Sequence, residues 1–227
     1  MPRSTLTREQ IVDAAVRLLD EEGLEGLNMR ALGKRLGSAA TAVYWHVGSK
    51  ADLISLAGDQ VWRGIPLPDP EAVAWRAAAT AMATDLHATL VRHPWLVQAF
   101  GSYLMFGPGK AGYDDRSLAV YEAAGFVGPH ADRAAAAVFT YVLGNALGPA
   151  AAASLERGLE GESEGGSLAE GMARAAEVAA RFPRLRARLE TAAAAGYADA
   201  PEDSFAFGLR AILDGLEAQL APGDRTR

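Results

Sequence analysis

Residues suited to contacts with nucleic acid gather in one short stretch, residues 39–50. Tyr44 and His46 carry groups that hydrogen-bond phosphate oxygens, and Lys50 adds a positive charge four residues after the histidine. The residues from Ala39 to Ala42 are small, so a helix that starts with them could approach base edges closely. The chemistry that this stretch offers is therefore binding to a polyanion.

The apolar spacing around this stretch predicts a helix-turn-helix over Met29 to His46. Asn28 is a suitable N-cap for a first helix that runs to Leu36. Gly37 opens a tight turn into a second helix, from about Ala39 to His46. In such a pair the second helix enters the major groove of DNA and presents its N-terminal residues to the bases.

One further helix is expected on each side of this pair. Thr7 and Gln10 have capping-box spacing and open a helix that stops at Gly23. Ser49 can cap a helix that runs to about Arg63. These helices would supply the apolar support that a short helix-turn-helix needs.

Three prolines, at positions 66, 68 and 70, predict a stiff linker from Gly64 to Pro70, and a domain boundary there. The chain is expected to be all-α, with a helix-turn-helix DNA-binding domain at residues 1–64 and a helical effector-binding and dimerisation domain at 65–227. The helices expected in the second domain span Pro70 to about Arg92, Pro94 to about Phe106, Tyr113 to Ala124, Ala131 to about Leu159, Leu168 to Phe182, Pro183 to Ala195, and a last helix from Pro201.

Charge is distributed unevenly along the 227 residues. The net charge is −6, yet residues 28–51 hold Arg30, Lys34, Arg35 and Lys50 and no acidic residue, so the rest of the chain carries −10. A small basic island on an acidic body suits a protein that touches phosphate at one end only. A chance gap in the acidic residues would give the same pattern.

Composition and spacing exclude several kinds of site and of protein. The chain has no cysteine, which excludes disulfides and thiolate metal sites. Gly and charged residues interrupt every long apolar run, and no signal-peptide pattern follows Met1, so we expect a cytoplasmic protein with no membrane partner. His87 and His93 are poorly spaced to share a metal ion, so neither a metal site nor a cofactor is expected.

Two segments resemble a known family. The run from Leu36 to Leu53, LGSAATAVYWHVGSKADL, is similar to the signature of the tetracycline-repressor (TetR) family, and its Tyr-Trp-His-Val part resembles the tetracycline-repressor-like subgroup. The run from Phe205 to Glu217, FAFGLRAILDGLE, resembles the last dimerisation helix of that subgroup. The resemblance is specific at residues 7–62 and 203–220 and architectural between them.

This resemblance implies a homodimeric transcriptional regulator that binds double-stranded palindromic operator DNA and leaves it when a small-molecule effector binds. Thr41 is followed by Ala42, where many relatives carry a further threonine, so the operator sequence does not carry over. The residues that match DNA-contacting positions of the family are Arg30, Ala40, Thr41, Tyr44, Trp45, His46 and Lys50.

An effector pocket is expected inside the helical bundle of residues 70–160. Aromatic walls with a few polar groups suit a small molecule, although any helical core has a similar composition. The His-and-Thr loop that the resemblance would require for a metal-chelated tetracycline has no match here. The candidate pocket residues are Leu86, His87, Trp95, Phe100, Tyr103, Phe139 and Asn145.

The last helix carries a single apolar stripe, which we expect to form the dimer interface together with the long helix at residues 131–159. The alternative is that the stripe packs inside one protomer. Its members are Phe205, Leu209, Ile212, Leu213, Leu216 and Leu220.

Two other classes of protein compete with this interpretation. A helical adaptor without DNA binding would share the composition and the helices. An enzyme is the less favoured class, because the sequence contains no nucleophile–base motif, phosphate-binding glycine loop or metal box.

Overall fold

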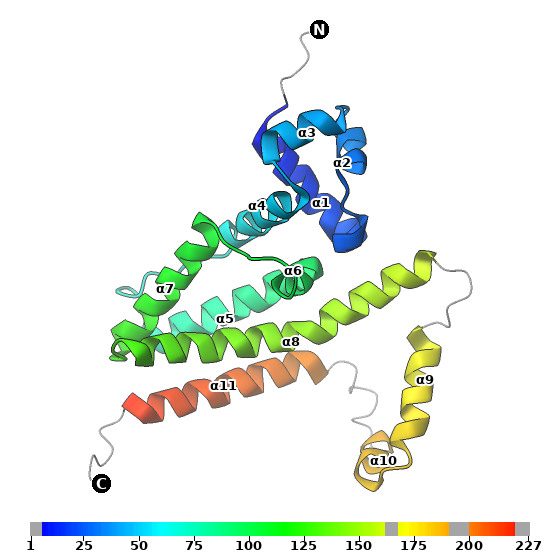
Figure 1. Ribbon diagram of the computed structural model, residues 1–227. Helices are drawn as coiled ribbons and strands as arrows, with labels where there is room; N and C mark the ends of the chain where they lie inside the picture. The colour runs from blue at the N-terminus through cyan, green and yellow to red at the C-terminus, as the bar shows by residue number, and fades with distance from the viewer. Residues whose placement is uncertain (1–5, 162–167, 191–199, 221–227) are drawn as a thin grey trace.

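The computed structural model describes residues 6–161, 168–190 and 200–220, which form eleven helices and no strand (Figure 1). The prediction of an all-α protein is therefore confirmed. The helices are α1 (Arg8–Gly26), α2 (Met29–Arg35), α3 (Ala40–Val47), α4 (Lys50–Arg63), α5 (Trp75–Arg92), α6 (Pro94–Phe100), α7 (Pro108–Ala124), α8 (Pro129–Gly161), α9 (Leu168–Ala179), α10 (Pro183–Leu189) and α11 (Ala200–Leu220).

Helices α1 to α3 form a small head at one end of the molecule, and α4 leads from it into the body (Figure 1). The predicted caps are present, since Thr7 and Ser49 each form a capping box and Asn28 accepts from the Ala31 N–H at 2.7 Å. Gly23 has φ 72° and interrupts α1, which confirms the predicted stop and shows that a further helical turn follows it.

The turn between α2 and α3 depends on a glycine that the sequence pattern did not single out. A Cβ atom on Gly33 would lie 2.8 Å from the Ser38 carbonyl oxygen and 3.1 Å from the Ala40 nitrogen. Both neighbours are backbone atoms and cannot swing aside. Gly37, with φ 61°, reverses the chain as predicted, and the Ser38 N–H donates to the Gly33 carbonyl at 2.9 Å.

Several predicted helix boundaries in the body were wrong. Helix α9 ends at Ala179 rather than Phe182, and α10 ends at Leu189, while the expected end at Ala195 lies outside the described residues. Helix α5 starts at Trp75 rather than Pro70, because Asp69 accepts from the Glu71 N–H and holds a local turn. Helix α6 ends at Phe100 rather than Phe106. Helix α7 starts at Pro108, so the expected Gly107–Gly109 loop is in part the first turn of a helix.

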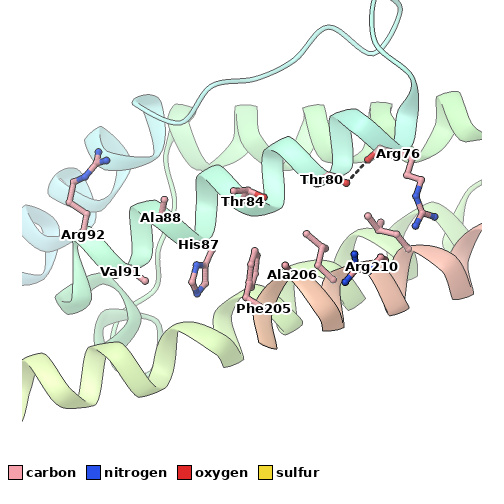
Figure 2. Close-up of a pocket in the computed structure, with 12 residues that line it drawn as sticks. Arg76, Thr80, Thr84, His87, Ala88, Val91, Arg92, Phe205, Ala206 and Arg210 are labelled. Carbon is pink, nitrogen blue, oxygen red and sulfur yellow. Dashed lines mark hydrogen bonds between the residues drawn. The ribbon is translucent and has the colours of Figure 1, made fainter. Parts of the chain in front are cut away.

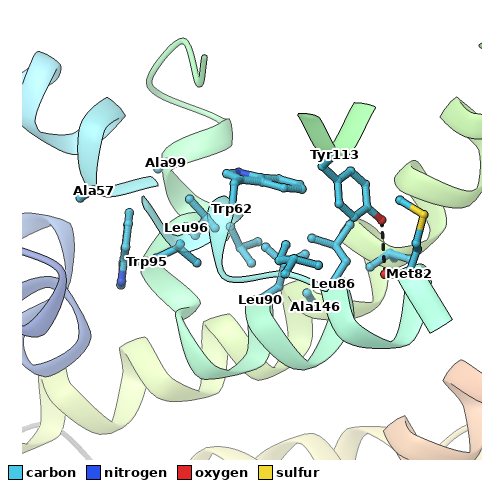
Figure 3. Packing of buried hydrophobic residues seen from close by; sticks show 14 of the residues in the cluster. Ala57, Trp62, Met82, Leu86, Leu90, Trp95, Leu96, Ala99, Tyr113 and Ala146 are labelled. Atoms are coloured by element: carbon cyan, nitrogen blue, oxygen red, sulfur yellow. Dashed lines mark hydrogen bonds between the residues drawn. The ribbon is translucent and has the colours of Figure 1, made fainter. Parts of the chain in front are cut away.

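One continuous apolar core joins the head to the body (Figure 3). Trp62, at the end of α4, and Trp95, in α6, are both almost completely buried. The Trp62 ring packs against Tyr113, with centroids 4.9 Å apart, and against Phe100 and Phe139. Helix α4 is therefore part of the body's core as well as of the head.

The Gly33 contact yields a stability prediction. Gly33→Ala should lower the free energy of unfolding by roughly 1–3 kcal/mol, because two backbone segments must separate to admit the methyl group. Gly112→Ala is the matched control, since nothing lies within 4 Å of its Cβ position in α7. That control should gain up to about 1 kcal/mol from helix propensity. Urea unfolding measures both changes, and equal stability of the two variants would contradict the tight turn.

Candidate DNA-binding head and ligand cavities

Helix α3 presents an exposed, polar and aromatic face at the end of the head. Val43 and Val47 anchor its inner side in the core. On the outer side Trp45 is 83% exposed and Tyr44 is 47% exposed, which is unusual for such large rings. The remaining predicted DNA-contacting residues on α2 and α3 are exposed or half-buried: Arg30, Ala40, Thr41 and His46.

The first turn of α3 has no side-chain cap. Its N-cap is Ala39, whereas the neighbouring helices α1, α2 and α4 are each capped by a hydroxyl or amide side chain. Apart from the Ala42 N–H, which donates to the Ala39 carbonyl at 3.0 Å, the early N–H groups of α3 receive no cap from a side chain, and the positive end of the helix dipole faces the same way. A phosphate oxygen of DNA would satisfy both.

Two of the basic residues near α3 are already engaged within the protomer. The Lys50 ammonium donates to the Leu24 carbonyl at 3.0 Å, near the end of α1. Arg35 forms an ion pair with Glu21, and this hydrogen bond lowers the pKa of the Glu21 carboxyl group. Lys50 would have to leave or share the Leu24 carbonyl in order to meet a phosphate.

A buried carboxylate joins α4 to α7. Asp59 is 4% exposed, and its Oδ1 accepts from the Gly109 N–H at 2.7 Å and the Lys110 N–H at 3.2 Å. Its other oxygen accepts from Arg63 at 2.6 Å. Asp59 therefore caps the first turn of α7 from a different helix, where a negative charge also complements the helix dipole.

Glycines allow α4 and α7 to come this close. A Cβ atom on Gly109 would lie 2.4 Å from the Asp59 carbonyl oxygen, and one on Gly107 would lie 2.2 Å from the Asp59 carboxylate. The Ser55 hydroxyl of α4 lies 3.5 Å from the Leu104 carbonyl and 3.4 Å from that of Phe106, just before α7. These contacts, which no sequence periodicity signals, make the α4–α7 junction the closest link between head and body.

A second link joins α1 to α6. Asp20 in α1 accepts a hydrogen bond from the Trp95 indole N–H, and its Oδ1 lies 2.7 Å from the His93 Nδ1. Both contacts lie at the start of α6, where Pro94 occupies the first helical turn. Trp95 was predicted to line the effector pocket, but the structure places it in the core with its one polar group already paired.

The structure separates the other predicted pocket residues. Leu86 is fully buried in the core, while Phe100 and Phe139 pack on Trp62. The Asn145 side chain donates to the Tyr141 carbonyl one turn back in α8, and Tyr103 is half-buried after α6. These residues do not share one cavity with His87.

The interior between α5, α7 and α8 holds little free space, and a cavity of about 220 Å³ opens beside it between α7 and α8, lined in part by Lys110, Ser117 and Phe139. A cavity of about 10 Å³ remains beside Met82, Tyr113, Ser117, Tyr121 and Phe139, too small for an organic ligand. Burial raises the pKa of both tyrosines well above the ordinary value. Within the described chain the buried Trp62 indole N–H, close to this space, has no hydrogen-bond partner.

A groove of about 820 Å³ lies between α5 and α11 (Figure 2). His87 from α5 stacks on Phe205 from α11, with ring centroids 4.1 Å apart and planes at 18°. Among the predicted pocket residues, His87 is the one that lines it. The lining consists of Arg76, Thr80, Thr84, His87, Ala88, Val91, Arg92, Phe205, Ala206, Leu209, Arg210 and Leu213.

The apolar stripe predicted on the last helix faces inward. Leu209 and Leu213 are at most 3% exposed within a single protomer, so their side chains are not available to a partner. The rest of the stripe follows the same side of α11: Phe205 and Leu216 are buried, and Ile212 and Leu220 are half-buried. The six side chains therefore pack within one protomer, which was the alternative to a dimer interface.

Comparison with known proteins connects this geometry to a family. One family model, described as Tetracyclin repressor-like, C-terminal domain, matches residues 67–220. A second, described as Bacterial regulatory proteins, tetR family, matches residues 11–57. The transcriptional repressor DrrR1 of Streptomyces coeruleorubidus is 33% identical over 225 residues, which cover 97% of this chain and 80% of the relative.

Solved structures share the whole fold. A possible TetR family regulator from Streptomyces coelicolor A3(2) has a TM-score of 0.73 at 29% identity, covering 93% of this chain and 98% of that one. ActR from Streptomyces coelicolor, in complex with actinorhodin, has a TM-score of 0.74 at 24% identity, covering 99% and 100%, and shows likeness of fold.

These findings define a helix-turn-helix transcriptional regulator rather than an enzyme or an adaptor. The chain belongs to the TetR family, as its sequence resemblance predicted. It is a ligand-responsive transcriptional repressor with a helix-turn-helix DNA-binding domain.

The α4–α7 junction yields a second prediction. Asp59→Asn should lower the free energy of unfolding by roughly 1.5–3 kcal/mol, because it removes the charge from three hydrogen bonds to a buried carboxylate. Asp115→Asn, an exposed substitution on α7, is the matched control and should be near neutral. Thermal unfolding followed by circular dichroism compares the two, and an unchanged melting temperature for the Asp59 variant would refute the capping role.

Proposed function

We propose that two copies of this chain bind a palindromic operator, with one α3 in the major groove at each half-site. The observation that carries this proposal is the outer face of α3, where Tyr44, Trp45 and Thr41 are exposed beside an uncapped helix start. In this arrangement Ala40 and Thr41 face base edges, while Arg30, His46 and Lys50 meet phosphates.

The proposed domain division falls at residues 64 and 65, with α4 spanning the connection. We place the protein in the bacterial cytoplasm, in keeping with its family. Repression ends when an effector shifts the body helices, because Asp59 couples α7 to α4 and α4 carries the head. A ligand can drive this change only if it binds the released state more tightly than the DNA-bound state.

We place the dimer contact on the outward faces of α8 and α11, which lie side by side (Figure 1). Small residues recur along the exposed side of α8 at Ala137, Gly144 and Ala151, and α11 exposes Ala211 and Phe207, the latter at 69%. Small side chains permit close helix approach, and a twofold axis would pair each face with its copy.

The same face of α8 accounts for a membrane-like signal. Pro129–Leu155 is long and apolar enough to span a bilayer by length and composition, since it contains an 18-residue stretch with a mean hydropathy of 1.3, of which 28% is buried within the protomer. Such a helix is also what a four-helix dimer interface requires. The family's regulators dimerise, so we assign the exposed apolar side to the partner subunit rather than to lipid.

Operator binding tests the proposed function directly. The purified full chain should select, from random duplex DNA, inverted repeats whose half-site centres lie one helical turn or a multiple of it apart. Arg30→Gln should lower the slope of log K against log salt concentration by roughly 0.9 per protomer, because one phosphate contact is lost.

Arg184→Gln, on the exposed surface of α10, is the matched control for that slope and should leave it unchanged. Selection of no DNA sequence at all would overturn the proposed function. An unchanged slope in the Arg30 variant would remove Arg30 from the interface.

The dimer face has its own test. Ala211→Glu should give monomers in sedimentation equilibrium, because two copies of the new carboxylate would be desolvated near the twofold axis. Ala123→Glu, at an exposed position of α7, should remain dimeric. Leu213 is unsuitable for this purpose because it is buried inside the protomer, and a charge there would unfold the chain. A dimeric Ala211 variant would place the interface elsewhere.

A further inference from the structure

The groove between α5 and α11 is much larger than the cavity in the interior and than the cavity of about 220 Å³ beside it. Its volume of about 820 Å³ lies in the range of small-molecule sites, whereas the interior cavity holds about 10 Å³. The two cavities lie on different sides of α5, since Thr84 and His87 line the groove while Met82 and Ala83 line the interior. A ligand in the groove would therefore need no opening of the core.

Charge in the groove has one sign. Its lining within the described chain contains three arginines and no carboxylate. Arg76 is held by Asp214 and Glu217 at one end of the groove. Arg210 is exposed on α11, and no hydrogen bond or ion pair engages it in the part of the chain that the structure describes. Arg92, the third arginine, is also exposed, but its side chain points away from α11 (Figure 2), so Arg210 is the cation best placed to meet an anionic ligand.

The floor of the groove is apolar and aromatic. The stacked rings of His87 and Phe205 meet across the gap between the two helices (Figure 2). The Tyr141 ring also stacks on Phe205, with ring centroids 5.8 Å apart. Leu209 and Leu213 complete the wall on the side of α11. A hydrophobic body would bury apolar surface here, and its anionic group would reach Arg210.

The groove is compatible with the proposed dimer. At about 100° per residue, Ala206 and Arg210 lie about 140° and about 100° around α11 from Ala211, and Arg210 lies about 60° from Phe207, at the edge of the proposed dimer face. A partner seated on the outward face of α8 and α11 would therefore leave Arg210 accessible from the groove. We propose that this groove is a binding site for a hydrophobic anion, an apolar molecule with one carboxylate-like group. The inference rests on the proposed function, because the hydrophobic anion would be the effector that releases the repressor from its operator.

The test measures binding of defined probes to the full chain without DNA, by isothermal titration calorimetry. The first pair is 2-naphthoate and 2-naphthamide, and the second pair is decanoate and decanamide, so that a flat and a linear body are compared at equal charge. In at least one pair the acid should bind about tenfold more tightly than its amide. The stronger pair identifies the ligand's shape.

Three variants locate the probe. Arg210→Gln should remove the tenfold preference for the acid over its amide while leaving amide binding intact. Arg184→Gln is the control and should change neither the affinity for the acid nor that for the amide. Thr84→Trp should block both members of the pair by filling the groove from an exposed position. Equal affinity of acid and amide, or an unchanged preference in the Arg210 variant, would overturn the proposal.

A fourth variant separates the groove from the interior. Ser117→Leu fills the small cavity among α5, α7 and α8 and reduces the cavity of about 220 Å³ between α7 and α8, since Ser117 lines both. Loss of probe binding in this variant, with binding retained in Thr84→Trp, would place the ligand in the interior and overturn the groove site. Because these measurements contain no DNA, probe binding to the groove is decided independently of whether the chain selects an operator.

Discussion

The buried carboxylate of Asp59 is the interaction on which the link between the two halves of the molecule depends. It belongs to α4, which carries the head, and it caps α7, which belongs to the body. Gly107 and Gly109 have no side chain at the positions where a Cβ would strike Asp59, which lets α4 and α7 approach closely. The hydrogen bonds from the Gly109 and Lys110 N–H groups to Asp59 then hold the two helices at that separation. A carboxylate this deeply buried needs all of its donors, and the junction is therefore stiff. A movement of α7 must move α4 with it.

The head could be predicted from the sequence almost to the residue, because its signals are local. A capping side chain, an apolar spacing of three and four, and a glycine turn each act within a few residues of the chain. The ends of the helices in the head could therefore be predicted from four residues, namely Thr7, Asn28, Ser49 and Gly37. The family resemblance covers the same segment, so a DNA-binding helix-turn-helix could also be predicted there from the sequence.

The body could be predicted as helical, but its cavities could not, because they depend on which helices meet. The stripe of Leu209 and Leu213 has the same spacing whether it faces a partner or the protomer's own core. Trp95 and Phe100 have a composition that suits a pocket, yet partners far away in sequence, Asp20 and Trp62, occupy them. Periodicity shows that a face is apolar but does not say what covers it.

The uneven charge of the chain has a consequence for how the protein finds DNA. The stretch from residue 28 to 51 carries four positive charges and lies at the head, while the remainder carries −10. A molecule charged in this way has a large electric dipole, and the field of a nucleic acid exerts a torque on it before contact. The acidic body is turned away and the α3 end is turned toward the duplex. A larger share of collisions then occurs with α3 facing the duplex, which raises the association rate. Added salt would screen the charges and reduce this effect.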